Sequence, residues 1–235
     1  MKLTQTHIEE LYKFTRKHYV YHYDVQTELV DHLANDIEEI WVAQPLLTFE
    51  DARDKSFKKF GVFGFMDVVE QKQNQMNKRY WKIILRFVKE WFTVPKIVVT
   101  SAIFLTFYLA LSLPFSIYVL MAAILGLAIH EMIKTAITRR KHKIKVKKKE
   151  NIFLLEAMIG ETRSTFTLIT FVNLFNIINL SQIDFNTLNN YWLFLIAALA
   201  TLFAIISYIT SVIIPQKAEE LLEETYPEYK LSKNL

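Results

Sequence analysis

His130 and Glu131 lie together inside one of the most apolar stretches of the chain and begin the pentapeptide HEMIK. In zinc proteases with the H-E-x-x-H motif, a second histidine four residues after the first lies on the same helical face and completes the metal site. Lys134 occupies that position here, so we expect no zinc site. Ionisable residues within apolar segments are functional candidates by default. His130 and Glu131 are therefore candidates for an ion or proton pathway, with solvation at a membrane boundary as the alternative.

Three asparagines, Asn173, Asn176 and Asn179, recur at steps of three in another apolar stretch. Steps of three drift slowly round a helix, so the amides form one polar stripe that should face protein or water rather than lipid. Two interpretations stay open: packing or homo-oligomerisation through amide hydrogen bonds, and a path for a ligand or ion. Amides do not titrate, so a proton path would need additional groups.

A third constellation surrounds His32, which on a helix has Glu28 and Asp36 as neighbours four residues away and Asp31 directly before it. Such carboxylates favour the imidazolium, so a pH-responsive contact is one interpretation and local ion pairing is the other. The acidic side chains here could also pair with the basic helix that follows.

No other residue set points to catalysis. The absence of cysteine excludes thiol chemistry, thiolate metal sites and a secreted disulfide scaffold. Only four glycines are present, and neither G-x-G-x-x-G nor G-x-x-x-x-G-K occurs. We expect no enzyme activity, no catalytic residue, no metal and no cofactor.

The elements that position these residues follow from the distribution of charge over 235 residues. Of 28 Lys and Arg, 15 lie in residues 1–96 and 9 in residues 134–150. Four nearly uncharged segments are long enough to cross about 30 Å of hydrocarbon as helices: 97–113, 115–133, 164–180 and 191–214. The predicted fold is all-α, with an N-terminal cytoplasmic helical domain (1–76), an interfacial linker helix (77–94) and a four-span transmembrane domain (95–214).

Positive charge predicts the orientation, because Lys and Arg near span ends stay on the cytoplasmic side. The basic loop 134–150 therefore faces the cytoplasm, as do both termini, including the acidic tail 215–235. No apolar signal-peptide core occupies residues 1–20, so we expect a multi-pass protein of the plasma (inner) membrane. The loop lacks aromatic residues, so anionic lipid headgroups explain it better than nucleic acid. The tail is predicted either to clasp the basic loop or the N-terminal domain, or to be solvated.

Turn chemistry divides the N-terminal domain into helices. Apolar residues recur at helical spacing over 24–42, Thr48 begins a helix with Asp51 three residues later, and Gly61 ends that helix. A further helix runs from about Met66 to Phe92. Its second half has a basic face opposite an apolar one, as a helix in the headgroup layer requires. The predicted membrane-interface residues are Lys78, Trp81, Lys82, Arg86, Lys89 and Trp91.

The stretch YDVQTELVDHLANDIEEIW, followed by Pro45 and TFEDARDKSFKKFGVFGF, resembles the small helical HAAS-type domain of bacterial multi-span membrane proteins, in a variant similar to that of the Bacteroidetes. The resemblance covers about residues 5–72 and departs from the family where Val-Phe-Gly follows Phe60-Gly61. It implies a cytoplasmic signalling module, often coupled to a PadR-type transcription regulator. The partner-binding candidates are Glu28, Asp31, His32, Phe57, Phe60 and Gly61.

Together these features favour a regulatory, signalling or scaffolding membrane protein that binds a cytosolic or membrane protein partner. The alternative is a small transporter, a channel or a subunit of a transport complex.

Overall fold

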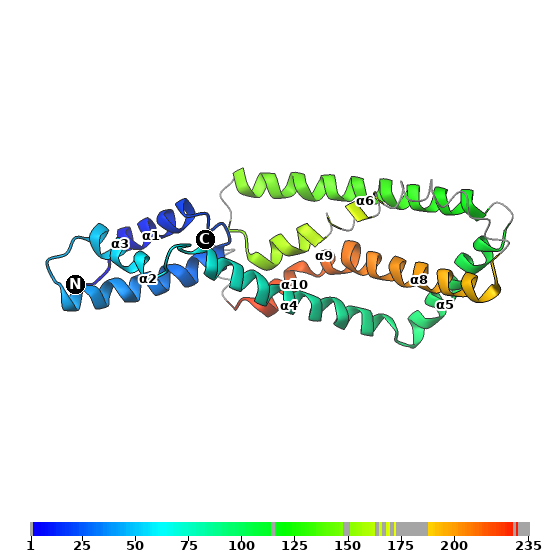
Figure 1. Cartoon of the computed structure of the whole chain (residues 1–235), viewed down its shortest axis with the longest axis horizontal. Coiled ribbons are helices and arrows are strands. Elements are labelled where there is room, and N and C mark those ends of the chain that lie inside the picture. The colour runs from blue at the N-terminus through cyan, green and yellow to red at the C-terminus, as the bar shows by residue number, and fades with distance from the viewer. Residues whose placement is uncertain are drawn as a thin grey trace. The chain divides into compact units, whose positions relative to one another are not determined.

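The computed structural model describes residues 2–113, 116–147, 151–162, 165, 168–169, 172, 188–227 and 229. Within these ranges every regular element is a helix, which confirms the all-α prediction. The chain forms two compact units (Figure 1). Unit 1 comprises Met1–Arg79 and Lys148–Ala157, and unit 2 comprises Tyr80–Lys147 and Met158–Leu235.

Unit 1 is built from α1 (Gln5–Lys17), α2 (Tyr23–Ala43), α3 (Phe49–Lys58) and the first half of α4 (Met66–Trp91). The predicted apolar stripe of α2 is buried, because its residues recur every three or four positions and face α1 and α3. This stripe consists of Val25, Leu29, Leu33, Ile37, Ile40 and Trp41.

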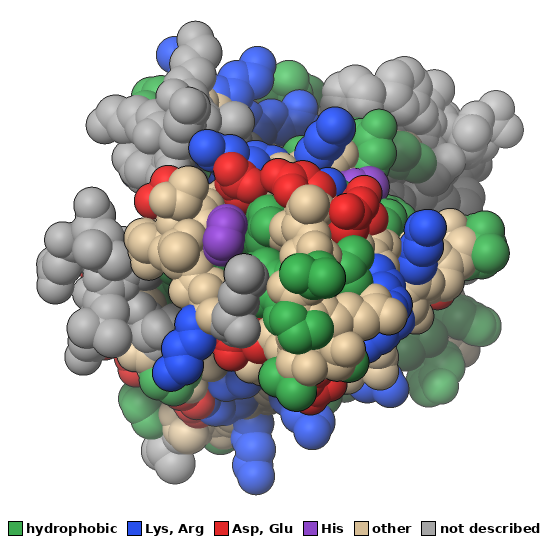
Figure 2. Space-filling view, turned by 90° about the vertical axis from the view of Figure 1, so that its left-hand side faces the viewer, with side chains coloured by type: hydrophobic (Ala, Val, Ile, Leu, Met, Phe, Trp, Pro, Cys, Tyr) green, Lys and Arg blue, Asp and Glu red, His purple; other side chains and the backbone are tan. Residues whose placement is uncertain are grey.

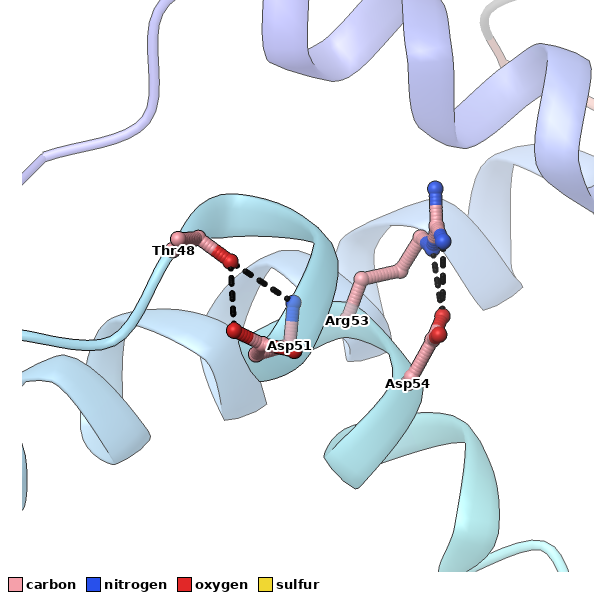
Figure 3. A network of polar contacts seen from close by, with 4 residues as sticks. All are labelled: Thr48, Asp51, Arg53 and Asp54. Atoms are coloured by element: carbon pink, nitrogen blue, oxygen red, sulfur yellow. Dashed lines mark hydrogen bonds and ion pairs between the residues drawn. The ribbon is translucent and has the colours of Figure 1, made fainter.

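The start of α3 agrees with the capping prediction. Thr48 accepts a hydrogen bond from the backbone N–H of Asp51 at 3.2 Å, and its hydroxyl donates to the Asp51 carboxylate at 2.8 Å (Figure 3). One turn later, Arg53 pairs with the neighbouring Asp54 at 2.7 Å. Gly61 follows α3 with φ +78°, so it adopts the left-handed conformation expected at a helix end.

Unit 2 contains the rest of α4 together with α5 (Val94–Leu111), α6 (Ser116–Lys147) and α8 (Asn190–Tyr208). A π-helical stretch, η2 (Ile209–Ile213), leads into the short helices α9 (Ile214–Gln216) and α10 (Ala218–Thr225). Helices α5 and α8 pack closely, with Leu111, Leu193 and Ala197 forming a buried cluster.

One helical stretch, Asn190–Gln216, is long and apolar enough to cross a membrane. A second candidate is the pair formed by α4 and α5, whose axes meet at 90°. The structure thus supports the fourth predicted span by length and composition and leaves the four-span arrangement a prediction.

Two predicted elements need further comment. The basic segment expected as a loop from residue 134 onward continues α6 as a helix to Lys147, because Lys and Arg are good helix formers and neither glycine nor proline interrupts it. The third predicted span, 164–180, lies almost wholly outside the described residues, and so do Asn173, Asn176 and Asn179.

Candidate functional site

An aromatic cluster lies beneath the turn between α3 and α4. The ring of Phe57 packs against those of Phe14, His18 and Phe65, with centroid distances of 5.3, 4.4 and 4.8 Å. Phe60 packs on Phe65 at 4.9 Å. Phe57 and Phe60, both predicted to bind a partner, are only partly exposed and mainly support the turn from below.

The turn itself presents apolar side chains to solvent. Val62 is 98% exposed and Phe63 71%, and Met66 is also exposed. We refer to Val62, Phe63 and Met66 as the apolar tip. Gly61 and Gly64, with φ of +78° and +55°, bracket the first two residues. Val62 and Phe63 were not predicted as partner-binding residues, although an apolar pair between two glycines is a sequence signal for an exposed turn.

Both the positive φ of the backbone and the close packing of the Phe57 ring require glycine at position 64. A Cβ atom added there would lie 2.9 Å from the Phe57 ring, closer than side-chain carbons normally approach. The aromatic cluster therefore packs directly against the turn that carries the apolar tip.

A second exposed apolar site lies at the connection between α2 and α3, where Val42 and Leu46 are exposed. Figure 2 views unit 1 from this end and shows apolar side chains intermingled with acidic and basic ones. This site has aromatic side chains of its own nearby, with Phe49 stacked on His7 at 4.4 Å, but no glycine of positive φ shapes it. It serves below as a matched control.

The acidic side chains of α2 have separate roles. Glu28 pairs with Lys72 at 2.6 Å, and Asp36 accepts from Ser56 at 3.0 Å and from Lys59 at 3.1 Å. The prediction that this helix pairs with the lysines of the next is thus confirmed for Asp36. Burial acts to raise the pKa of Asp36, but the hydrogen bonds from Lys59 and Ser56 outweigh it and lower this pKa below its ordinary value.

Asp31 and His32 remain exposed on α2. The His32 ring lies edge-on to Phe60 at a centroid distance of 5.4 Å, which places it beside the turn that carries the apolar tip.

Unit 1 also contains a segment from the middle of the chain, residues 151–157, which we call the inserted segment. The backbone N–H of Tyr23 donates to the carbonyl of Ile152 at 2.9 Å, and the N–H of Leu154 donates to the Asp24 carboxylate at 3.0 Å. Phe153, Leu154 and Leu155 are fully buried. This contact was not predicted from the sequence.

In unit 2, the second half of α4 is amphipathic as predicted, but two of its six proposed interface residues make intramolecular contacts. Arg86 forms a bidentate ion pair with Glu224 of α10, with distances of 3.0 to 3.2 Å. This carboxylate raises the pKa of the Arg86 guanidinium. The Trp91 indole N–H donates to Thr100 at 3.0 Å, and its ring packs on Tyr208 at 5.6 Å.

The Arg86–Glu224 pair also bears on the acidic tail, which was predicted to clasp the basic loop or the N-terminal domain. Glu224 instead contacts the helix between those two regions. Leu221 and Leu222 of α10 are buried, so the tail helix is packed rather than freely solvated.

The other predicted interface residues, Lys78, Trp81, Lys82 and Lys89, are exposed on α4. The neighbouring Tyr80 is buried, and this burial raises the pKa of its hydroxyl to about 12, an effect that Thr162 partly offsets. Buried and exposed side chains thus occupy adjacent positions of α4, with Tyr80 buried and Trp81 exposed.

Glu131 carries the one buried carboxylate within the described ranges, at 4% exposure, and its Oε2 atom has no hydrogen-bond partner. Thr135, one turn further along α6, is buried too, whereas His130 is exposed. No cluster of three metal-ligating residues occurs in the part of the chain that the structure describes. His130 and Glu131 therefore differ in burial, and only Glu131 is a buried ionisable group of the kind that marks a functional site in an apolar segment.

No family model matches the chain, and no curated protein or solved structure is significantly similar to it. Function must therefore be inferred from the contacts of the described residues.

Proposed function

We propose that this chain is a multi-pass membrane protein with a cytoplasmic protein-interaction domain, and that it acts as a regulatory, signalling or scaffolding component rather than as an enzyme. The observation that carries this proposal is the apolar tip of unit 1. Val62, Phe63 and Met66 are costly to expose together to water, and unlike the equally exposed Val42 and Leu46 they follow or lie within a turn that two glycines of positive φ shape.

The membrane part of the proposal is supported by the apolar surface of unit 2. Apolar side chains are exposed along α5, α6 and α8, among them Val98, Ile129 and Leu199. A core helix of a soluble protein would bury such residues, whereas lipid solvates them. Four spans with both termini in the cytoplasm of a bacterium remain the arrangement that the basic residues 134–149 favour.

The path of the chain supports coupling between partner binding and the membrane helices. The chain crosses between the two units three times: within α4 after Arg79, after Lys147, and after Ala157. The inserted segment is held by hydrogen bonds and buried side chains, so a change of unit 1 reaches the helix at 154–162 through covalent connections. Such a linkage suits a relay.

The partner class follows from the resemblance of residues 5–72 to a HAAS-type domain, which is often coupled to a PadR-type transcription regulator. We propose a cytosolic protein of this kind. Its surface should offer an apolar pocket for Phe63, with Asp31 and His32 beside the contact on α2.

The proposal is tested by purifying the full-length protein from its native membrane in mild detergent and identifying bound proteins by mass spectrometry. Val62→Ser with Phe63→Ser should remove a specific cytosolic partner. The matched control, Val42→Ser with Leu46→Ser, removes an equally exposed apolar pair from the same unit and should retain the partner. Equal recovery from wild type and both variants would contradict a role for the apolar tip.

A second candidate function, transport or channel activity, is favoured by Glu131 alone. A buried carboxylate oxygen without a hydrogen bond is expensive in an apolar segment and is retained where it binds an ion or a proton. The test is proton flux into proteoliposomes loaded with a pH-sensitive dye, with Glu131→Gln and, as control, Glu156→Gln. Flux lost only in Glu131→Gln would support transport, and equal flux in all three proteins would rule out this role of Glu131.

A further inference from the structure

The outer surface of α4 in unit 2 is uncovered although it is largely apolar. Trp81 and Leu85 are each 62% exposed and Phe92 is 42% exposed. Trp81 and Leu85 are four positions apart, so at 3.6 residues per turn they lie on one stripe of α4. Phe92 directly follows the last residue of α4 and still donates its N–H to the Val88 carbonyl at 3.4 Å, so it extends this stripe at the end of the helix. The opposite side of the same helix is buried through Ile83, Ile84 and Phe87.

Positive charge borders this stripe on one side. Lys82 and Lys89 are exposed and seven positions apart, so they form a second line next to the apolar one. Arg86 lies further round the helix and its charge is matched by Glu224. We define the outer face of α4 as Trp81, Lys82, Leu85, Lys89 and Phe92.

The angle between α4 and α5 restricts what can cover this face. The two helices meet at 90°, and the break between them includes Phe92 and Thr93. If α5 crosses a bilayer near its normal, α4 must run along the bilayer surface.

From these observations we propose that the outer face of α4 docks on the headgroup layer of an anionic bilayer. Trp81, Leu85 and Phe92 insert among the upper acyl carbons, and the ammonium groups of Lys82 and Lys89 contact anionic headgroups. This inference rests on the proposed membrane location of unit 2 and adds the lipid class and the residues that recognise it. The predicted set of interface residues is thereby narrowed, since Arg86 is paired with Glu224 and Trp91 is half-buried against Tyr208.

Charge complementarity selects the bilayer over a protein partner. An apolar stripe with lysines along one border matches a fluid surface that is apolar below and negatively charged above. A single helical stripe without a groove offers a protein partner little area, whereas a bilayer requires no pocket.

The absence of cysteine allows a direct test on the full-length protein. Spin labels are attached to single cysteines at Leu85, Leu199 and Gln75, and the protein is reconstituted in vesicles with or without phosphatidylglycerol. Electron paramagnetic resonance then compares collisions of each label with oxygen, which concentrates in lipid, and with a water-soluble nickel complex.

In anionic vesicles the label at Leu85 should favour oxygen, the label at Leu199 should favour it more strongly, and the label at Gln75 should favour nickel. Lys82→Gln with Lys89→Gln should lower the ratio of docked to undocked protein by roughly 30-fold, since each lysine contributes about fivefold. The matched control Lys13→Gln, an exposed lysine of unit 1, should leave this ratio unchanged.

Two results would overturn the inference. A label at Leu85 as accessible to nickel as that at Gln75 would place the outer face in water, and a label shielded from both reagents would place it against protein. The label at Leu199 separates these failures from failure of the proposed function, because a nickel-accessible Leu199 would contradict the membrane location itself.

Discussion

The carboxylate of Asp24 accepts a hydrogen bond at 3.0 Å from the backbone N–H of Leu154, a residue 130 positions away in the chain. Asp24 lies in the first turn of α2, and Leu154 begins the helical stretch 154–162, so one side chain near the start of α2 caps the start of another helix. The adjacent bond from Tyr23 to Ile152 fixes the same segment from the backbone. This pair of contacts makes the inserted segment part of unit 1.

Replacing Asp24 by Ala should loosen the inserted segment, because a capping bond of this kind contributes about 1 kcal/mol. Hydrogen–deuterium exchange in peptides covering 151–157 should accelerate about fivefold, as that energy implies. Asp24→Asn keeps an oxygen acceptor and should exchange nearly as slowly as wild type. Unchanged exchange in Asp24→Ala would show that burial of Phe153–Leu155 alone holds the segment.

The two glycines of the α3–α4 turn should respond differently to alanine. Gly61→Ala meets no atom within 4 Å, so it adds only the strain of a positive φ, about 1 kcal/mol. Gly64→Ala adds the same strain and also forces the Phe57 ring to move, so it should destabilise unit 1 by about 2–4 kcal/mol.

The fluorescence of Trp41, buried in unit 1, reports this unfolding once the other three tryptophans are replaced by Phe. Equal unfolding midpoints for the two alanine variants would mean that the Phe57 ring moves at no cost.

Local features of unit 1 could be predicted from the sequence because they depend on neighbours in the chain. The stripe of α2, the capping of α3 by Thr48 and the left-handed Gly61 follow from residue spacing and backbone preference. The inserted segment could not be predicted in this way. Its partner lies 130 residues away, and an apolar run such as Ile152–Leu155 is equally compatible with the start of a membrane helix.

In the candidate sites too, features that depend on local residue spacing were predicted, and contacts between distant residues were not. Helical periodicity placed Lys82 and Lys89 on one face of α4, as observed, but could not show that Arg86 pairs with Glu224, since many acidic residues could serve. Phe57 and Phe60 were predicted to bind a partner from the resemblance to a HAAS-type domain. Only the positions of the rings reveal that both support the turn, while Val62 and Phe63 form its surface.

The ion pair of Asp36 predicts a pH-dependent stability of unit 1. Because Ser56 and Lys59 lower its pKa, Asp36 stabilises the folded state above its ordinary pKa of 3.8, and this contribution disappears as the pH falls through the lowered value. Asp36→Asn should therefore unfold more easily at pH 7, by about 1–2 kcal/mol. The difference from wild type should vanish in strong acid.

Trp41 fluorescence measures both proteins across this pH range. Asp54→Asn provides the control, since its exposed pair with Arg53 contributes below about 1 kcal/mol. A difference that persisted at low pH would show that Asp36→Asn acts through packing rather than through charge.

The last prediction concerns what holds α10 in place. Arg86 and Glu224 are both partly exposed, so breaking their pair should cost below about 1 kcal/mol despite the bidentate geometry. Leu222 is buried, and exchanging it for Ser should cost about 2–4 kcal/mol.

Trypsin cleavage after Lys217, followed by mass spectrometry, should then accelerate less than about fivefold in Glu224→Gln and by more than about 30-fold in Leu222→Ser. High salt should accelerate cleavage of wild type more than that of Glu224→Gln, because it screens the Lys217–Glu220 pair in both proteins and the Arg86–Glu224 pair only in wild type. Equal acceleration in the two variants would instead show that the ion pair with Arg86 holds α10 as strongly as the burial of Leu222 does.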